Sequence, residues 1–234
     1  MKTAPLVIAI CLLALQGGCA AGSNPPDFDD PAPEAGKKTT PTGDSGTQNP
    51  GEPDAEAVDT GPPPCVYPSG PYGKTQGSVI PQSLTWQGYA PGSSSVSTVS
   101  AADLYDCDGR NGVNAILFDE SALWCGACQQ EAQAMPQFMQ TWGPQGVKVV
   151  WLIIQDQAGQ PANTSHALWW RNSFNLGSFA YVVADPAFTF AHSGNNGLPT
   201  NLLVDPRTMQ IVKIVEGFGG MDPAVSQLAL KNKK

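Results

Sequence analysis

Two cysteines, Cys125 and Cys128, lie three residues apart within residues 124–128, which read WCGAC. An apolar run at 115–118 precedes the pair and a helical pattern follows it, which predicts that the second cysteine lies in the first turn of a helix. Cα atoms one helical turn apart are separated by about 5 Å, within the span of a disulfide. Unpaired N–H groups at the helix start would face the Cys125 sulfur and stabilise its thiolate. The chemistry that this spacing predicts is thiol–disulfide exchange, in which the second thiol releases a mixed disulfide.

Apolar periodicity supplies the elements that must position this pair. Buried strands are expected at 115–118 and 147–154 with a helix over 126–142 between them, which together form a right-handed, parallel β-α-β unit. The remaining expected elements are a strand at 83–89, helices at 163–174, 186–191 and 222–230, a strand at 181–184, and a hairpin of strands at 201–204 and 210–215. In the last helix, Asp222 is expected as N-cap and Pro223 as the first helical residue. The chain is therefore predicted to be α/β, with a mixed central sheet and helices on both faces.

The first hundred residues divide by composition. Residues 1–18 read as an export signal, because Lys2 precedes an apolar run at 6–15 that is too short to span a bilayer as a mature helix. Residues 15–19 resemble a bacterial lipoprotein processing site, although Leu15 stands one position further from Cys19 than usual. Lipidation of Cys19 is expected; ordinary cleavage to a soluble exported protein is the alternative. Residues 19–64 are expected to be a disordered, acidic, Pro/Gly-rich tether, and 65–100 an N-terminal extension of one domain over 65–234.

Charge narrows the class of partner. The chain has 20 acidic and 12 basic residues, and most of the acidic excess lies in the tether, so the domain is close to neutral. This balance argues against nucleic-acid binding. The exported chain is expected to contact the membrane only through its lipid anchor, facing the periplasm or the cell exterior, and to be a monomer.

A second motif extends the first one. Residues 197–200 read GLPT and are followed by an expected strand, and this loop together with the helix-opening CxxC resembles the thioredoxin superfamily. The export signal, the tether and the Asp185-Pro186 step narrow the resemblance to extracytoplasmic oxidoreductases of the TlpA/ResA type, over residues 101–230. It implies a thioredoxin-like three-layer sandwich that exchanges its dithiol with disulfides of proteins outside the cytoplasm. Two features depart from the family: Gly-Ala stands between the cysteines, and Pro136 lies eight residues beyond Cys128 where about five is usual.

The resemblance also implies residue roles. Cys125 is the nucleophile and Cys128 the resolving thiol. Asp119 corresponds to a buried carboxylate that accepts the Cys128 proton, because burial raises a carboxyl pKa; a locally satisfied strand-end group is the alternative. Pro199 is expected to follow a cis peptide bond, with the Leu198 backbone pairing with an extended substrate; a trans proline that only stiffens the loop is the alternative.

Further substrate contacts are expected around the pair. Trp124 would shield the disulfide and offer an apolar docking surface, although burial alone would also explain it. Gly126, Ala127 and Thr200 complete the expected substrate-binding set. Glu131 is interpreted as an acid that stabilises the first turn of the helix.

The cysteine count gives one more pairing. Cys11 leaves with the signal, Cys19 takes the lipid, and the CxxC pair is accounted for, so Cys65 and Cys107 are expected to form a structural disulfide. Closing a loop of about 40 residues would stabilise the folded state by about 4 kcal/mol in the chain-entropy model. In the alternative, one of these two cysteines exchanges with the active pair.

Other classes of function remain open from the sequence. The expected partners are protein thiols and disulfides and an unidentified redox partner, without organic cofactor or metal. A copper chaperone would use Cys125, Cys128 and possibly His192 as ligands. A peroxidase is disfavoured, because the Thr-x-x-Cys context of peroxiredoxins is missing before Cys125. In a redox-silent binding module, the Cys125–Cys128 bond would only hold the fold together.

Overall fold

The computed structural model describes residues 65–190, 197–219 and 221–234. The predictions for the signal peptide, for Cys19 and for the tether fall on residues 1–64, outside the described part, and so does the one for His192. Within the described ranges, no helix is long and apolar enough to cross a bilayer.

Strand β3 (Ala115–Ala122) is the central element, and all eight of its residues are buried. It pairs in parallel with β4 (Val147–Gln155) and antiparallel with β6 (Thr200–Asp205). A strand paired on both edges and covered on both faces reads as a continuous apolar run, which is why 115–118 was recognisable in the sequence. The strand continues four residues further, through the polar residues Asp119, Glu120 and Ser121, which are buried with it.

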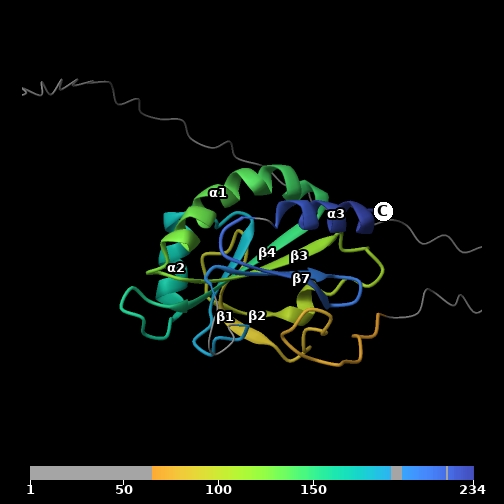
Figure 1. The fold of residues 1–234 in the computed structure, drawn as a ribbon, viewed down its shortest axis with the longest axis horizontal. Helices are drawn as coiled ribbons and strands as arrows, with labels where there is room; N and C mark the ends of the chain where they lie inside the picture. The colour runs from red at the N-terminus through yellow and green to blue at the C-terminus, as the bar shows by residue number, and fades with distance from the viewer. Residues whose placement is uncertain (1–64, 191–196, 220) are drawn as a thin grey trace, which may run out of the picture. The chain divides into compact units, whose positions relative to one another are not determined.

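The sheet has seven strands in the order β2-β1-β5-β4-β3-β6-β7 (Figure 1). The other strands are β1 (Thr85–Tyr89), β2 (Ser97–Ser100), β5 (Ala180–Ala184) and β7 (Gln210–Glu216). Strands β3, β4 and β5 are mutually parallel, whereas the β1–β2 and β6–β7 hairpins extend the two edges antiparallel. The mixed α/β sheet predicted from the sequence is confirmed.

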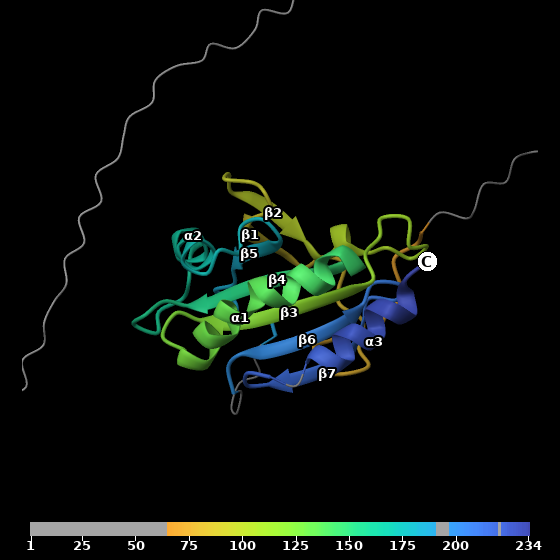
Figure 2. The same cartoon turned by 90° about the horizontal axis from the view of Figure 1, so that it is seen from above.

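Three α-helices pack into one apolar cluster with one face of the sheet: α1 (Gly126–Trp142), α2 (Thr164–Ser173) and α3 (Asp222–Asn232). The crossovers β3-α1-β4 and β4-α2-β5 step across the sheet in the same direction, so two right-handed crossovers bring α1 and α2 to the same face. Figure 2 shows α1 and α3 over this face. Helix α3 begins one residue earlier than predicted, because Met221 is its N-cap and Asp222 its first residue.

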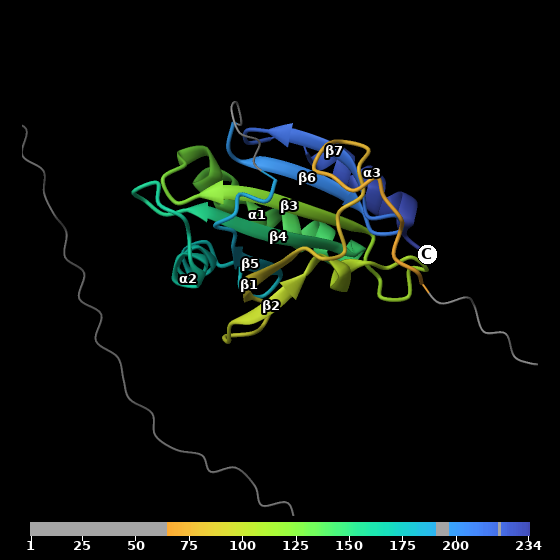
Figure 3. The same ribbon diagram turned by 90° about the horizontal axis from the view of Figure 1, so that it is seen from below.

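The opposite face, for which helices were also expected, carries a second apolar cluster and, among the described residues, only the 3-10 turn η1 (Ala101–Leu104) as helix (Figure 3). Phe118 packs there against Trp86 and Phe190, beside η1. The helix predicted over 186–191 is wrong for its described part, 186–190, which is a turn and bend. The Asp185 carboxylate accepts hydrogen bonds from the N–H (2.6 Å) and hydroxyl (2.8 Å) of Thr189, and such side-chain bonds compete with a helix. The layer covering this face is thus mainly extended chain from the N-terminal segment.

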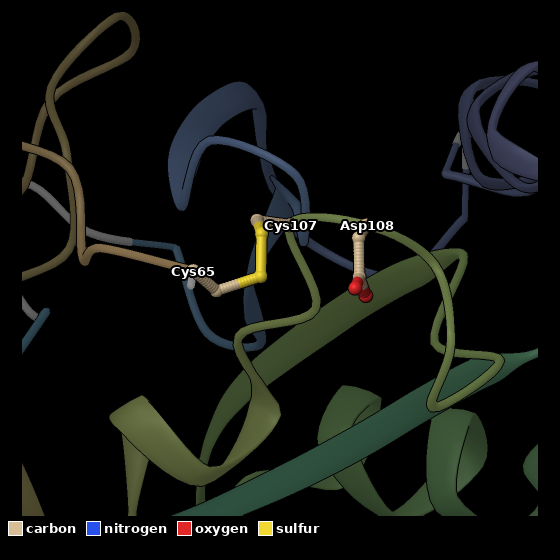
Figure 4. Close-up of side chains that lie close together, drawn as sticks. All are labelled: Cys65, Cys107 and Asp108. Atoms are coloured by element: carbon tan, nitrogen blue, oxygen red, sulfur yellow. A yellow bond between two sulfur atoms is a disulfide. The ribbon is translucent and has the colours of Figure 1, made fainter. Parts of the chain in front are cut away.

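A disulfide joins Cys65 to Cys107, with 5.8 Å between the Cα atoms (Figure 4). It ties the first described residue to the loop before β3, across 42 residues of chain. The nearby Asp108 carboxylate forms an ion pair with Arg110 at 3.0 Å. Because the two sulfur atoms are bonded to each other, the group of Cys65, Cys107 and Asp108 offers no pair of thiolates for a metal.

Replacing both Cys65 and Cys107 by serine is expected to lower the free energy of unfolding by about 2–4 kcal/mol, since the unfolded chain regains the freedom of a 42-residue loop. Urea unfolding of the oxidised proteins measures the difference. As a control, the variant should exchange a small-molecule disulfide at the wild-type rate, because its CxxC pair is untouched. An unchanged unfolding midpoint would contradict the structural role.

Candidate active site

The CxxC pair lies where the central strand turns into α1. The Cys125 N–H donates to the Ala122 carbonyl (3.0 Å), which makes a tight turn out of β3 and leaves Cys125 as the N-cap of α1. The Cys125 sulfur accepts the Cys128 N–H at 3.1 Å and is bonded to the Cys128 sulfur, with Cα atoms 5.3 Å apart. Cys125 is 5% exposed and Cys128 is fully buried. Of the two sulfurs, that of Cys125 therefore lies nearer to solvent and accepts a free N–H of the helix.

Trp124 stands beside the disulfide with 46% of its surface exposed. Its indole N–H donates to the Gln155 side-chain carbonyl at 2.9 Å, and the Gln155 amide donates to the Gly159 carbonyl at 2.8 Å. Gln155 is the last residue of β4, so the neighbouring strand fixes the orientation of this exposed ring. Gln155 was not predicted from the sequence, since nothing in its local pattern indicates a contact across 31 residues.

The loop that carries Pro199 enters the sheet at the same end. Thr200 pairs with Glu120 across β3 and β6, near the end of β3 from which Cys125 emerges. The Leu198–Pro199 peptide bond is cis, Pro199 is buried, and its carbonyl accepts the Gly217 N–H at 2.7 Å. Leu198 is half-buried and packs against the apolar cluster that contains both active cysteines, as Ala127 does.

Asp119 is fully buried and shares its sheet face with Leu117, the face that α1 covers. The Ser121 hydroxyl donates to one carboxylate oxygen at 2.5 Å, and the other oxygen has no partner among the described residues. Burial raises the pKa of Asp119 well above its ordinary range, and the Glu131 carboxylate raises it further. Both effects favour the protonated form of this carboxyl group.

Glu131 corrects the sequence interpretation. It does not lie in the first turn of α1 but is 7% exposed beneath the helix, one turn beyond Cys128. The Asn201 side-chain amide donates to both of its carboxylate oxygens at 3.1 Å, and Asn201 lies directly opposite Asp119 in the β3–β6 ladder. Burial raises the pKa of Glu131 to about 7, with a further contribution from Asp222, although the Asn201 hydrogen bond acts in the opposite direction.

The sequence contains a signal that Glu131 lies on the covered face of its helix. It stands three residues after Cys128 and four before Met135, both of which are buried. Residues at this spacing share one helix face, so an acid at 131 belongs to the covered stripe. Together with Asp119 and Asn201, it forms a buried polar cluster, which we call the carboxyl cluster. Within the part of the chain that the structure describes, the Asn201 side-chain carbonyl oxygen has no partner.

His166, the histidine among the described residues, caps the start of α2. His166 Nδ1 accepts the Asn163 N–H at 3.2 Å, and the Asn163 side chain in turn accepts N–H groups at the start of α2. This reciprocal capping box satisfies otherwise unpaired donors at the start of the helix.

A mixed sheet whose central strand passes through a CxxC disulfide into a helix, with a cis-proline loop entering the adjacent strand, is a thioredoxin-like α/β fold. No family model and no curated protein matches the chain. Similar solved structures include the thiol:disulfide interchange protein DsbE from Chlorobium tepidum, with 25% identity, 68% of this chain and 99% of that chain covered, and a TM-score of 0.48.

Two further solved structures show the range of this similarity. A thioredoxin-family thiol:disulfide interchange protein from Chlorobium tepidum is 17% identical, covers 67% of this chain and 99% of its own, and has a TM-score of 0.45. A 2-Cys peroxiredoxin from Plasmodium vivax is 11% identical, covers 65% of this chain and 79% of its own, and has a TM-score of 0.48. Because these scores lie below 0.5, the functional assignment has to come from the geometry of the site itself.

The raised pKa of Glu131 makes stability depend on pH. Its value is about 7 in the folded chain against an ordinary 4.5, so the folded state holds a proton that the unfolded state releases, and stability falls as the pH rises between these values. The loss attributable to Glu131 is about 3 kcal/mol, and Asp119 acts in the same direction. We expect Glu131→Gln to flatten the fall between pH 5 and pH 8 and to be more stable than wild type at pH 8, measured by urea unfolding of the oxidised protein.

The side-chain amide that Glu131→Gln introduces could also donate to the unpartnered Asn201 oxygen, which adds to the expected gain. Glu216→Gln, at the exposed end of β7, is the matched control and should leave the pH dependence unchanged. Parallel curves for wild type and Glu131→Gln would show that Glu131 does not titrate in this range.

Proposed function

We propose that the protein is a thiol–disulfide oxidoreductase that exchanges its Cys125/Cys128 dithiol with disulfides of other proteins. The observation that supports this most directly is the hydrogen bond from the Cys128 N–H to the Cys125 sulfur at the N-cap of α1. A helix start stabilises negative charge, so Cys125 in the reduced protein is the thiol that ionises more readily. The greater exposure of Cys125 agrees with its role as nucleophile.

The proposed exchange takes place in two steps. The Cys125 thiolate attacks one sulfur of the substrate disulfide, forms a mixed disulfide and expels the other substrate sulfur as a thiolate. Cys128 then gives up its proton, its sulfur attacks the Cys125 sulfur, and the second substrate thiolate leaves. Two electrons pass from the dithiol to the substrate, and the chain ends with the disulfide that the structure contains. The reverse sequence oxidises a substrate dithiol, so the redox partner sets the direction.

The buried carboxyl groups provide an acceptor for the Cys128 proton. Glu131 lies one helical turn from Cys128 on the covered face, and Asp119 lies on the strand beneath, coupled to Glu131 by charge. Both have raised pKa values, which makes each a better acceptor for a thiol proton than an ordinary carboxylate. We assign this function to Asp119 and add Glu131 as its partner.

The substrate would dock on the surface around the Cys125 sulfur. Trp124, Gly126, Ala127 and Leu198 would border it, and the Pro199 loop would direct an extended segment across the site. Thr200 differs from the other members of this expected set: it is 4% exposed, and its hydroxyl lies 3.5 Å from the Gly197 carbonyl oxygen. We assign Thr200 to shaping the loop.

The proposed setting is outside the cytoplasm. Cleavage of residues 1–18 and lipidation of Cys19 would anchor the chain, and residues 19–64 would hold the domain near the membrane surface. There it would meet exported proteins with disulfides and a redox partner that sets its oxidation state, with no organic cofactor or metal in the exchange.

Serine variants of the two active cysteines test the assignment. We expect Cys125→Ser to abolish reduction of insulin by the dithiothreitol-driven protein, because the attacking sulfur is lost. Cys128→Ser should instead accumulate a mixed disulfide on Cys125, because the resolving sulfur is missing, and mass spectrometry of the trapped species identifies it. The Cys65→Ser/Cys107→Ser variant is the control and should retain activity. Absence of both wild-type reduction and trapped species would favour a redox-silent binding module.

The proton-accepting function of Asp119 has its own test. In Asp119→Asn the second step should slow by about 100-fold at pH 7, since general-base catalysis contributes at least that factor, while formation of the mixed disulfide stays within a few-fold of wild type. Rapid-quench measurement with a small-molecule disulfide separates the two steps. Equal slowing of both steps, or no change in the pH profile of the second, would assign Asp119 a structural role only.

A further inference from the structure

A groove of about 620 Å³ runs along α1, between this helix and the residues that lead into α3. We call it the α1–α3 groove. It begins at Glu131 and Leu117 on the inside and ends at Trp142, and Phe218 and Asp222 form its opposite wall. Both helices lie over the same face of the sheet, as Figures 1 and 2 show. The CxxC end of α1 adjoins the Glu131 end of the groove, since Glu131 follows Cys128 by one turn.

The charged residues that line the α1–α3 groove are all acidic. Its lining contains two carboxyl groups, Glu131 and Asp222, and no lysine, arginine or histidine among the described residues. Glu131 is more than nine-tenths buried, and its carboxylate senses Asp222 strongly enough for Asp222 to contribute to its raised pKa. Asp222 also lies in the first turn of α3, where it offsets the positive end of the helix dipole. A positively charged group between the two carboxylates would relieve their repulsion.

Three aromatic rings give the groove a second feature. Phe138 and Trp142 of α1 and Phe218, which is 51% exposed, all line the groove. Aromatic faces attract lysine and arginine head groups, and their apolar surfaces accommodate the aliphatic stems of these side chains. Two carboxyl groups and three aromatic rings in one groove together fit a basic side chain better than an acidic or purely apolar one.

We propose that the α1–α3 groove receives a lysine or arginine side chain of the polypeptide whose disulfide reacts with Cys125. This inference rests on the proposed function and adds a substrate class to it: proteins that carry a basic residue near the reactive cysteine. Along the axis of α1, the groove extends from about 5 Å to about 21 Å beyond Cys128. An extended segment advances about 3.3 Å per residue, so the basic side chain would lie about two to six residues from the substrate cysteine.

The test compares disulfide-linked peptides that differ at one position, with lysine, glutamine or glutamate placed two to six residues from the cysteine on either side. We expect kcat/KM for reduction to be about 5- to 30-fold higher with lysine than with glutamine at one or more positions, and lower with glutamate. The lysine preference should weaken in 0.5 M salt, because part of it is an interaction between charges at the surface.

Variants on the exposed rim connect the preference to the groove. Asp222→Asn and Phe218→Leu are surface substitutions, and each should bring the lysine/glutamine ratio close to 1. Phe218→Leu, which removes no charge near Glu131, should also leave reduction of hydroxyethyl disulfide unchanged. Asp103→Asn, an exposed acid in η1 on the opposite face, is the matched control and should keep the ratio. A ratio near 1 in the wild type at every position, or one unaffected by either rim variant, would overturn the inference and leave the proposed function intact. If hydroxyethyl disulfide is also not reduced, the proposed function itself fails, and the inference with it.

Discussion

The removal of the end of strand β3 from water is the constraint on which the site depends. The strand pairs with β4 and β6 and is covered on both faces. The carboxyl groups near its C-terminal end, those of Asp119 and Glu120, are therefore buried. On the α1 face, burial of Asp119 favours its neutral form. On the other face, Glu120 accepts the Phe190 N–H at 2.6 Å. A fold that buries this strand end therefore places a carboxyl group of raised pKa on the sheet face that α1 covers.

The two faces of the sheet serve different purposes as a consequence. The helical face holds the CxxC pair, the carboxyl cluster and the α1–α3 groove, whereas the opposite face is closed by the N-terminal segment. Arg207, in the turn between β6 and β7, joins the loop before β3 to the end of α3: its guanidinium forms an ion pair with Asp106 at 3.1 Å and donates to the Val113 and Asn232 carbonyls at 2.9 Å. Burial alone would raise the pKa of Asp106, but N–H donors and Arg207 outweigh it and lower the pKa. The start of β3 is thus held by charge-assisted bonds, and its end by burial.

The features that could be predicted from the sequence are those determined by residues close together in the chain. The bounds of α1 were predicted without error and those of β4 and β7 within one residue, because periodicity and flanking turn residues determine them within one segment. Glu131 was misread for the opposite reason: whether its helix face is covered depends on Asn201 and on the chain leading to α3, about 70 and 90 residues away. The turn at 186–190 likewise follows from Asp185 and Thr189 binding each other, which periodicity alone does not reveal.

Glu131 belongs to both the carboxyl cluster and the groove, so binding of the proposed basic side chain would be coupled to the proposed proton transfer. A cation seated between Glu131 and Asp222 favours the ionised form of Glu131, because opposite charge lowers a carboxyl pKa. Ionised Glu131 in turn raises the pKa of Asp119, since like charge disfavours a second carboxylate nearby. Occupation of the groove would therefore make Asp119 a stronger base at the moment when Cys128 must lose its proton. By linkage, protonation of Asp119 would strengthen the binding of the same cation, so the two sites would reinforce each other until the product leaves.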